Sequence, residues 1–351
     1  MGGPARWTSV VAALVLAGCS GAATPEATTP AARPATSSGT ATTSGTATSS
    51  TSADPAPTAG APTYAFQDSN FRILLVGPDG VTHPLDSLTS GPEDNPDWSP
   101  DGSRLTFVGQ GTDLGSHPGL WVVGADGTGL RRLVDCTGSC RFVDDPAWSP
   151  DGDEIAFTRL APGPRAGGTL EVVDVLSGRT RTLLTAKPGE GYAGVRYAPD
   201  GKALVLEWVH ATVQDYDDTK GVTLIAVDLT TSPPRTKALT DPALFAQTAD
   251  WSPKGDLIQY AALPAAGARG TDLYLVRPDG TGRRRLTTLA DRGGAAEHAD
   301  FSNDAKTLVF VGADPQHGLD GLLQVDVATG TVSAFGKGNL TGHHPRSRPV
   351  P

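Results

Sequence analysis

The sequence has few of the residues that favour α-helices. Only one of its 351 residues is methionine, and aspartate outnumbers glutamate 31 to 7. Glutamate, lysine and methionine favour helices, whereas aspartate, glycine and proline favour turns. The chain contains 43 glycines and 29 prolines. This balance argues against a helical bundle and predicts many short strands joined by tight turns.

Basic residues are also scarce. Lysine and arginine number 28 against 38 acidic residues, which gives a formal net charge of -10. Such a chain cannot neutralise phosphate groups over a broad face, so we predict no nucleic-acid partner.

The N-terminus lacks a hydrophobic run long enough to cross a bilayer. The apolar run Thr8–Ala17 is short and predicts a secretory signal instead. The run ends in Leu16-Ala17-Gly18-Cys19, which resembles a bacterial lipobox. That resemblance implies that residues 1–18 are removed as a signal peptide and that Cys19 is acylated, so the lipid holds the protein at the outer face of the cell membrane. The alternative is an ordinary signal peptide with a chance cysteine.

Large apolar residues are absent from the next segment. Residues 19–60 are almost entirely alanine, threonine, serine, proline and glycine, with Glu26, Arg33 and Asp54 as the only charged residues. Such a segment cannot offset the entropy cost of ordering, so we predict a disordered tether. A flexible chain of about 41 residues reaches roughly 35 Å on average.

The rest of the chain repeats at intervals of about 50 residues. NPDWSPDGSRLTFVG begins at Asn95, and related segments follow four more times. Each contains an aromatic residue, here called the anchor, and successive anchors are 50, 49, 54 and 50 residues apart. The five anchors are Trp98, Trp148, Tyr197, Trp251 and Phe301. A repeat of this length indicates one supersecondary unit per repeat.

Each repeat has the same predicted local structure. A short strand ends at the anchor, and Pro-Asp-Gly or a related sequence then forms a turn. A second strand with alternating apolar residues follows, and then a hairpin. Four strands of this size leave both faces of their sheet exposed, and stacking the sheets around an axis buries them. The sequence therefore predicts an all-β fold, a six-bladed β-propeller of four-stranded antiparallel blades, over residues 61–340.

The sixth blade is incomplete at the start of the repeats. Residues 64–85 supply three strands, so the innermost strand must come from elsewhere. Residues 341–351 are either a tail or the strand that closes the ring, with His344 to Val350 as the candidate strand. His343 and His344 are interpreted as part of a tail.

The WSPDG and DWSPKG segments resemble the WD40-like repeat of TolB-type periplasmic six-bladed β-propellers. The resemblance covers about residues 64–336 and implies the fold. It implies little about function, because similar repeats occur in the propeller domains of prolyl-oligopeptidase-type peptidases and in assorted lipoproteins. The chain also lacks the small α/β domain that precedes the propeller of TolB, so a role in a Tol-Pal system is not implied.

Propellers usually bind ligands at a channel mouth, in the loops that lead into the innermost strands. Aligning the repeats on their anchors places charged residues four, three and one positions before them. These predicted ligand- or partner-binding residues form the candidate ring: Asp94, Asp97, Asp144, Asp145, Arg196, Asp250, Glu297, His298 and Asp300. Such a ring could receive a cationic peptide segment or a hard cation. The alternative is that these aspartates cap turns and blade edges and recur only through duplication.

No other motif predicts chemistry. The chain has no EF-hand-like run, no HExxH and no GxSxG, so we predict no metal site, no cofactor and no catalytic residue. The recurring Ser99, Ser149, Ser252 and Ser302 are expected to bond their turns. Cys136 and Cys140 are expected to form a local disulfide outside the cytoplasm, which stabilises the fold by about 2 kcal/mol.

Three functional hypotheses follow. The leading one is a monomeric, lipid-anchored, non-enzymatic propeller that binds a protein or cell-envelope component through its channel mouth. The second is an enzyme that acts on envelope glycans or peptides with channel-mouth carboxylates as acid and base. The third is a structural spacer.

Overall fold

The structure is a computed structural model of the whole chain, in which residues 63–77, 81–85, 88–110, 117–138, 140–161, 167–211, 219–336 and 340–350 are described. They belong to one compact unit, Gly60–Pro351. The predicted signal peptide, the lipidation site Cys19 and the tether lie outside the described residues. Among the described residues, no helix is long and apolar enough to cross a membrane.

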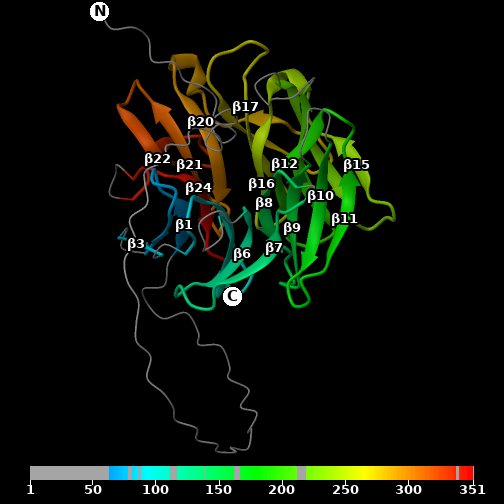
Figure 1. The fold of residues 1–351 in the computed structure, drawn as a ribbon. Helices are drawn as coiled ribbons and strands as arrows, with labels where there is room; N and C mark the ends of the chain where they lie inside the picture. Colours follow the sequence, from blue (N-terminus) through cyan, green and yellow to red (C-terminus); the bar gives the residue numbers. More distant parts are fainter. Residues whose placement is uncertain are drawn as a thin grey trace, which may run out of the picture. The chain divides into compact units, whose positions relative to one another are not determined.

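Six four-stranded antiparallel sheets, here called blades 1 to 6 in chain order, make up the unit (Figure 1). Blade 1 consists of β24 (His343–Ser347), β1 (Tyr64–Gln67), β2 (Ile73–Val76) and β3 (Thr82–Pro84). Blade 2 consists of β4 (Glu93–Trp98), β5 (Arg104–Gly109), β6 (Gly119–Gly124) and β7 (Arg131–Asp135). Blade 3 consists of β8 (Phe142–Trp148), β9 (Glu154–Leu160), β10 (Gly168–Asp174) and β11 (Thr180–Thr185). Blade 4 consists of β12 (Glu190–Tyr197), β13 (Ala203–Ala211), β14 (Thr219–Asp228) and β15 (Arg235–Ala238). Blade 5 consists of β16 (Gln247–Trp251), β17 (Ile258–Ala262), β18 (Asp272–Val276) and β19 (Arg284–Arg285). Blade 6 consists of β20 (Ala295–Phe301), β21 (Thr307–Asp314), β22 (Leu319–Asp326) and β23 (Val332–Ala334). Short 3-10 helices, η3 (Pro242–Leu244) and η4 (Ala290–Arg292), precede β16 and β20.

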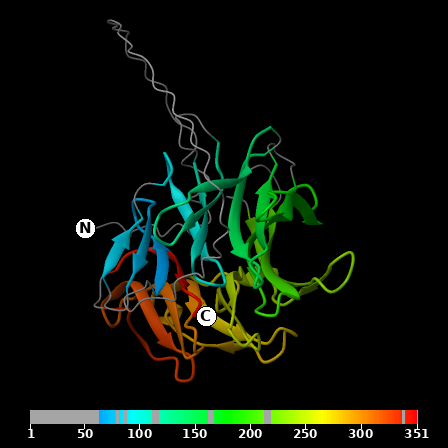
Figure 2. The same cartoon turned by 90° about the horizontal axis from the view of Figure 1, so that it is seen from below.

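The sheets are grouped around a common centre as a six-bladed β-propeller, which confirms the predicted fold class (Figure 2). Each of the five anchors is the last residue of the innermost strand of its blade. The repeat therefore marks the same structural position five times.

The turn after each anchor is held by its serine. In blade 2 the Ser99 hydroxyl donates to Asp101 at 2.5 Å and accepts from the Arg104 amide at 2.9 Å, while Gly102 takes a left-handed φ of 66°. Serine-to-aspartate bonds of the same kind recur after the anchors of blades 3, 5 and 6. The recurring serines thus bond their turns, as predicted.

The hydrophobic core is divided among the blade interfaces. Each of six clusters of buried residues draws on two neighbouring blades. Trp148 of blade 3, for example, packs with Leu120 and Val122 of blade 2. Because each sheet buries its apolar faces only against its neighbours, the blades stabilise one another around the whole ring.

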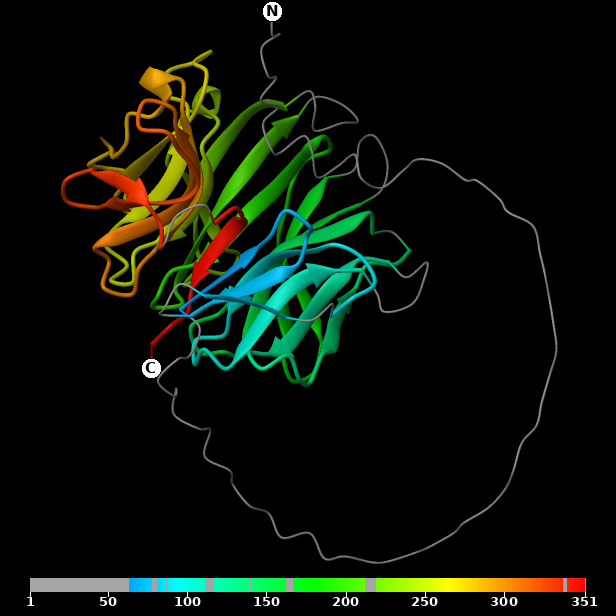
Figure 3. The ribbon, with the colours of Figure 1, turned by 90° about the vertical axis from the view of Figure 1, so that its left-hand side faces the viewer.

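The C-terminal strand closes the ring. β24 pairs antiparallel with β1, so the innermost strand of blade 1 comes from the opposite end of the chain (Figure 3). His343 and His344 begin this strand, so their interpretation as tail residues is wrong. Separately, Cys136 and Cys140, the pair expected to bond, are joined by a disulfide between blades 2 and 3.

Candidate functional site in the central channel

Every innermost strand bends at the same place. The register of its pairing shifts between the residues four and one positions before the anchor in blades 2 to 6. The residue three positions before the anchor has a left-handed φ between 49° and 60° in all five. In β24 the same conformation occurs at His344, with a φ of 50°. The bulge breaks the alternation of side chains and turns adjacent residues toward the channel and the neighbouring blade.

The residues at the bulges form one layer of the channel, here called the bulge layer. Its members come from the positions four and three before the anchor and include Asp94, Asn95, Asp144, Asp145, Gly194, Thr248, Glu297, His298, His343 and His344. The second strand of blade 4 adds Glu207, whose Oε1 accepts from the Thr248 amide at 2.6 Å.

Polar contacts in the bulge layer pass from blade to blade. Asn95 donates to Asp144 at 2.7 Å, and the Gly194 amide donates to Asp145 at 2.8 Å. The His298 amide donates to the Thr248 hydroxyl at 3.1 Å. His298 and His344 pack with ring centroids 4.0 Å apart, and His344 lies 3.6 Å from Asp94. Together with the bond from Thr248 to Glu207, these contacts link all six blades.

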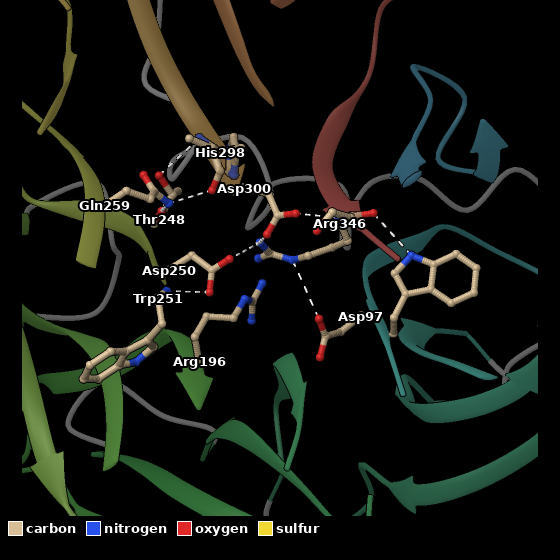
Figure 4. Close-up of polar contacts among 12 residues, drawn as sticks. Asp97, Arg196, Thr248, Asp250, Trp251, Gln259, His298, Asp300 and Arg346 are labelled. Carbon is tan, nitrogen blue, oxygen red and sulfur yellow. Dashed lines mark hydrogen bonds and ion pairs between the residues drawn. The ribbon is translucent and has the colours of Figure 1, made fainter. Parts of the chain in front are cut away.

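The residues one position before each anchor form a second layer, here called the anchor layer. Its members are Asp97, Ala147, Arg196, Asp250, Asp300 and, in β24, Arg346. Arg346 reaches across the channel, where its guanidinium nitrogens lie 3.5 Å from Asp300, 3.7 Å from Asp250 and 4.0 Å from Asp97 (Figure 4). Arg196 lies beside this group in the same view.

Two aspartates of the anchor layer also join neighbouring blades. Asp97 accepts from the Trp148 amide at 2.8 Å, and Asp300 accepts from the Ser347 amide at 2.5 Å. Asp250 instead accepts from the amide of its own anchor, Trp251. For Asp97 and Asp300, these contacts support the structural alternative, in which the repeated aspartates hold blade edges together.

Burial shifts the protonation equilibria of both layers. It raises the pKa of Asp97 to about 6, of Asp94 to about 7 and of Glu207 to about 8. Burial and hydrogen bonding to Asp250 raise the pKa of Asp300 well above its ordinary range. Several of these carboxyl groups therefore hold a proton near neutral pH.

The histidines shift in the opposite direction. Burial lowers the pKa of His298 to about 3, with smaller contributions from His343 and Arg196. Burial also lowers the pKa of His343 and His344. The imidazoles are therefore neutral, and they do not offset the charge of the carboxylates.

Some buried polar atoms of the channel have no hydrogen-bond partner among the described residues. They include Nε of Arg196, Nε of Arg346 and Oδ1 of Asn95. Arg196 is only 6% exposed, and within the described part of the chain its side chain donates one hydrogen bond, from a terminal nitrogen to the Val195 carbonyl. A buried guanidinium with unused donors is costly, so this site can gain free energy from an acceptor.

A cavity of about 180 Å³ lies where the innermost strands end. Asp97, Arg196 and Asp250 supply its charged lining. Its remaining lining is aromatic and proline-rich: Trp98, Pro100, Ala147, Trp148, Ser149, Pro150, Tyr197 and Pro349. The sequence predicted a binding mouth at the loops that lead into the innermost strands. The cavity instead lies at the opposite ends of these strands, where the anchors are.

The candidate ring is thus divided. Asp97, Arg196, Asp250 and Asp300 lie in the anchor layer, and the first three line the cavity. Asp94, Asp144, Asp145, Glu297 and His298 lie in the bulge layer. Among the described residues, no group of three or more histidine, cysteine, aspartate or glutamate side chains could hold a metal ion.

Sequence reasoning missed Glu207, His344 and Arg346. Glu207 lies on β13, the second strand of blade 4, whereas the sequence comparison covered only positions just before each anchor. The two others belong to His344-Pro345-Arg346-Ser347-Arg348-Pro349, which matches Asn95-Pro96-Asp97-Trp98-Ser99-Pro100 position by position. The shared prolines could have identified this segment as a sixth copy of the repeat. Ser347 in place of the aromatic anchor made the match hard to recognise.

No protein-family profile and no curated protein matches its sequence. Among solved structures, TolB from Acinetobacter baumannii is similar with a TM-score of 0.61 and 16% identity, over 84% of this chain and 68% of that one. The putative TolB from Agrobacterium tumefaciens has a TM-score of 0.54 and 19% identity, over 78% and 88%.

An enzyme is also among the similar structures. Oligogalacturonate lyase from Vibrio parahaemolyticus has a TM-score of 0.55 and 12% identity, over 82% of this chain and 85% of that one. At these identities the likeness concerns the fold alone. Together with the closed ring of six blades, it shows that the chain has the six-bladed β-propeller fold found in TolB.

Proposed function

We propose that this protein is an extracytoplasmic, non-enzymatic binding protein that takes a segment of a protein or cell-envelope component into the cavity beside the anchor layer. The observation that carries the proposal is the combination of Arg196, Asp97 and Asp250 with tryptophan and tyrosine side chains around about 180 Å³. Ligand sites in proteins commonly combine apolar walls with a few converging polar groups.

The interior of the channel supports binding at its mouth. Arg346 spans the anchor layer, and the contacts of the bulge layer connect the blades around the axis. Both layers hold the blades in place. A ligand therefore meets a preformed, rigid surface, which lowers the entropy cost of binding.

The location completes the proposal. We place the protein at the outer face of the cell membrane as a monomer, held by a lipid on Cys19 and extended by the tether of residues 19–60. The apolar run before Leu16-Ala17-Gly18-Cys19 supports this placement.

The second candidate is an enzyme acting on envelope glycans or peptides. Asp97 favours it, because this carboxyl group lines the cavity and its pKa is raised to about 6. Asp97 is also bound to the Trp148 amide and lies near Arg346, contacts that a freely reacting acid or base does not need. We therefore favour binding without catalysis.

Capture from an envelope extract tests the proposal. The immobilised full chain is compared with an Asp97→Asn, Asp250→Asn double variant, which preserves hydrogen-bond acceptors while removing two charges. The exposed change Asp320→Asn is the matched control. We expect a component that is enriched on the wild type and the control and reduced about tenfold or more on the double variant.

Equal recovery on all three proteins, or no enriched component, would contradict the proposal. The enzyme is tested on the same proteins by mass spectrometry of peptidoglycan fragments. Products formed by the wild type and lost in the Asp97→Asn variant would establish catalysis instead.

A further inference from the structure

A groove continues outward from the cavity along the interface of blades 3 and 4. It encloses about 650 Å³ and shares Ser149, Pro150 and Tyr197 with the lining of the cavity. Its outer end is formed by Arg181, Thr182 and Leu183 on β11, the outermost strand of blade 3. The two spaces therefore adjoin, and their linings together extend from Asp250 in the channel to β11 at the edge of blade 3.

The anchors of blades 2 and 3 are each covered by an arginine. The Arg104 guanidinium lies 4.9 Å from the ring centroid of Trp148, and that of Arg348 lies 5.3 Å from Trp98. Arg104 comes six residues after the anchor of blade 2 and covers the anchor of blade 3. An arginine over an aromatic ring gains a cation–π attraction.

At the interface of blades 3 and 4, an acidic residue occupies the position that Arg104 has in blade 2. Six residues after the anchor of blade 3 stands Glu154, beside Tyr197 of blade 4. None of the arginines described in the structure stacks over the Tyr197 ring. Tyr197 instead lines both the groove and the cavity.

The groove has an excess of negative charge. Asp151, Glu154 and Asp200 line it, against the single cation Arg181. Arg181 pairs with Glu154 at 2.8 Å, and hydrogen bonds from Ser149 and the Asp153 amide lower the pKa of Asp151. Burial and then the Glu154 carboxylate raise the pKa of Tyr197. Asp200 lies 4.0 Å from the ammonium group of Lys202, so among the described groove carboxylates only Asp151 has no ion pair. A cation that enters beside Tyr197 therefore meets an aromatic ring and the Asp151 carboxylate.

We propose that the groove binds an extended peptide segment of a partner protein and that a lysine or arginine side chain of this segment stacks on Tyr197 between Glu154 and Asp151. The inference rests on the proposed function and names the class of ligand that continues from the cavity.

The shape and lining of the groove favour a peptide. An extended chain fits the two adjoining spaces, and the hydroxyl groups of Thr182, Thr231 and Ser232 along the groove can bond to a peptide backbone. Pro150, Pro199 and Pro234 supply rigid apolar surface. The partner's cation takes the position over Tyr197 that Arg104 takes over Trp148.

A displayed library of random dodecapeptides, selected on the immobilised full chain, tests the inference. We expect the enriched peptides to share a lysine or arginine at a fixed position. One enriched peptide is then synthesised with its cation and with citrulline, a neutral side chain of similar shape. We expect the citrulline peptide to bind about 3- to 30-fold more weakly.

Two changes in the protein locate the site. Tyr197→Leu removes the ring, and we expect binding to weaken about 3- to 30-fold, whereas Tyr197→Phe keeps the ring and most of the affinity. Glu154→Arg places a guanidinium at the position that Arg104 has in blade 2. We expect this variant to stay folded and to lose the peptide, while Glu154→Gln, the matched control, loses less.

The outcomes separate this inference from the proposed function. Peptides that lack a common cation, or that bind the Tyr197→Leu and Glu154→Arg variants as tightly as the wild type, overturn the inference. If such peptides still depend on Asp97 and Asp250, the cavity remains a binding site and only the groove is excluded. Failure to enrich any peptide overturns the peptide ligand, while the envelope extract tests the cavity independently.

Discussion

A left-handed backbone conformation occurs three positions before each of the five anchors and at His344, the equivalent position of β24, although only Gly194 among these six residues is a glycine. Other residues adopt this conformation at a cost of about 1 kcal/mol or more each. The contacts between blades offset this cost. In the bulge layer, the free-energy cost of the strained backbone is therefore balanced by hydrogen bonds between neighbouring blades.

Substitution of Gly194 tests how much the backbone conformation and close packing at the bulge contribute to stability. A Cβ added there would meet Oε1 of Glu207 and lie 3.0 Å from its Cδ, at a φ of 60°. We expect Gly194→Ala to lower the free energy of unfolding by about 2 to 4 kcal/mol. Gly178→Ala is the matched control, because its φ is 70° but the nearest atom to the added Cβ is 3.9 Å away.

Chemical denaturation of both variants measures the difference. The control is expected to lose about 1 kcal/mol, the cost of the left-handed conformation alone. Equal losses in the two variants would show that Gly194 has no special place beside Glu207.

The buried carboxyl group of Glu207 predicts a dependence of stability on pH. Its pKa in the folded protein is raised to about 8, so its contribution to stability is complete below its unfolded pKa of about 4.3 and is lost as the pH rises toward 8. Glu207→Gln is neutral at every pH and keeps an acceptor for the Thr248 amide. We expect the variant to gain stability relative to the wild type between pH 4.5 and 8.

Unfolding at several pH values measures this gain. It should approach roughly 1 kcal/mol for each unit by which the folded pKa is raised. Asp320→Asn, at an exposed position, is the control and should show little change in slope. A stability difference between Glu207→Gln and the wild type that does not vary with pH contradicts the burial of an ionisable Glu207.

At the scale of the elements, most strands followed from the sequence because their signals are local. Each anchor, Pro-Asp-Gly turn and alternating strand lies within about 15 residues, and the six sheets confirm them. β24 was harder to identify because its partner β1 lies nearly the whole chain away and its own anchor position holds Ser347. Pro345 weakens the strand signal further, but β24 pairs on one side only, where proline is tolerated.

The candidate site was less predictable than the strands. Alignment on the anchors identified Asp97, Arg196 and Asp250, which line the cavity. It did not show that Arg346 would reach three of the aspartates, because that contact depends on the closure of the ring. Nor did it show which end of the channel holds a cavity, since this depends on how the side chains fill the centre.

β24 contributes charge as well as backbone pairing. Arg346 lies near three aspartates of three other blades, and its side chain is only 11% exposed. We expect Arg346→Met, which keeps the aliphatic stem, to cost roughly 2 kcal/mol or more because it leaves buried carboxylates without their cation. The loss should be larger at pH 8 than at pH 5, because the raised pKa values of Asp97 and Asp300 leave more of these two groups protonated at pH 5.

Thermal unfolding of the variant at both pH values measures this effect. Arg181→Met, which removes a largely exposed ion pair with Glu154, is the control and should cost about 0.5 kcal/mol or less. A loss for Arg346→Met as small as that of the control would contradict the role of Arg346 in the anchor layer.

At the scale of the whole molecule, the blades form a closed ring. The six hydrophobic clusters lie at the interfaces between neighbouring blades, so opening one interface exposes apolar surface on two blades. The anchor layer and the cavity both assume that β24 lies between blades 6 and 2. Pro349, which follows this strand, lines the cavity directly.

A disulfide between β1 and β24 tests the closed ring most directly. Tyr64 and Ser347 face each other in the register of the two strands, so cysteines at both positions should bond on mild oxidation. In a closed ring, we expect Tyr64→Cys with Ser347→Cys to form this disulfide nearly completely, as read by mass spectrometry of the proteolysed protein. Tyr64→Cys with Ser177→Cys in blade 3 is expected to form none. If the first pair forms no bond, or bonds no more than the second, the ring is not closed by these strands and the channel site described above does not exist.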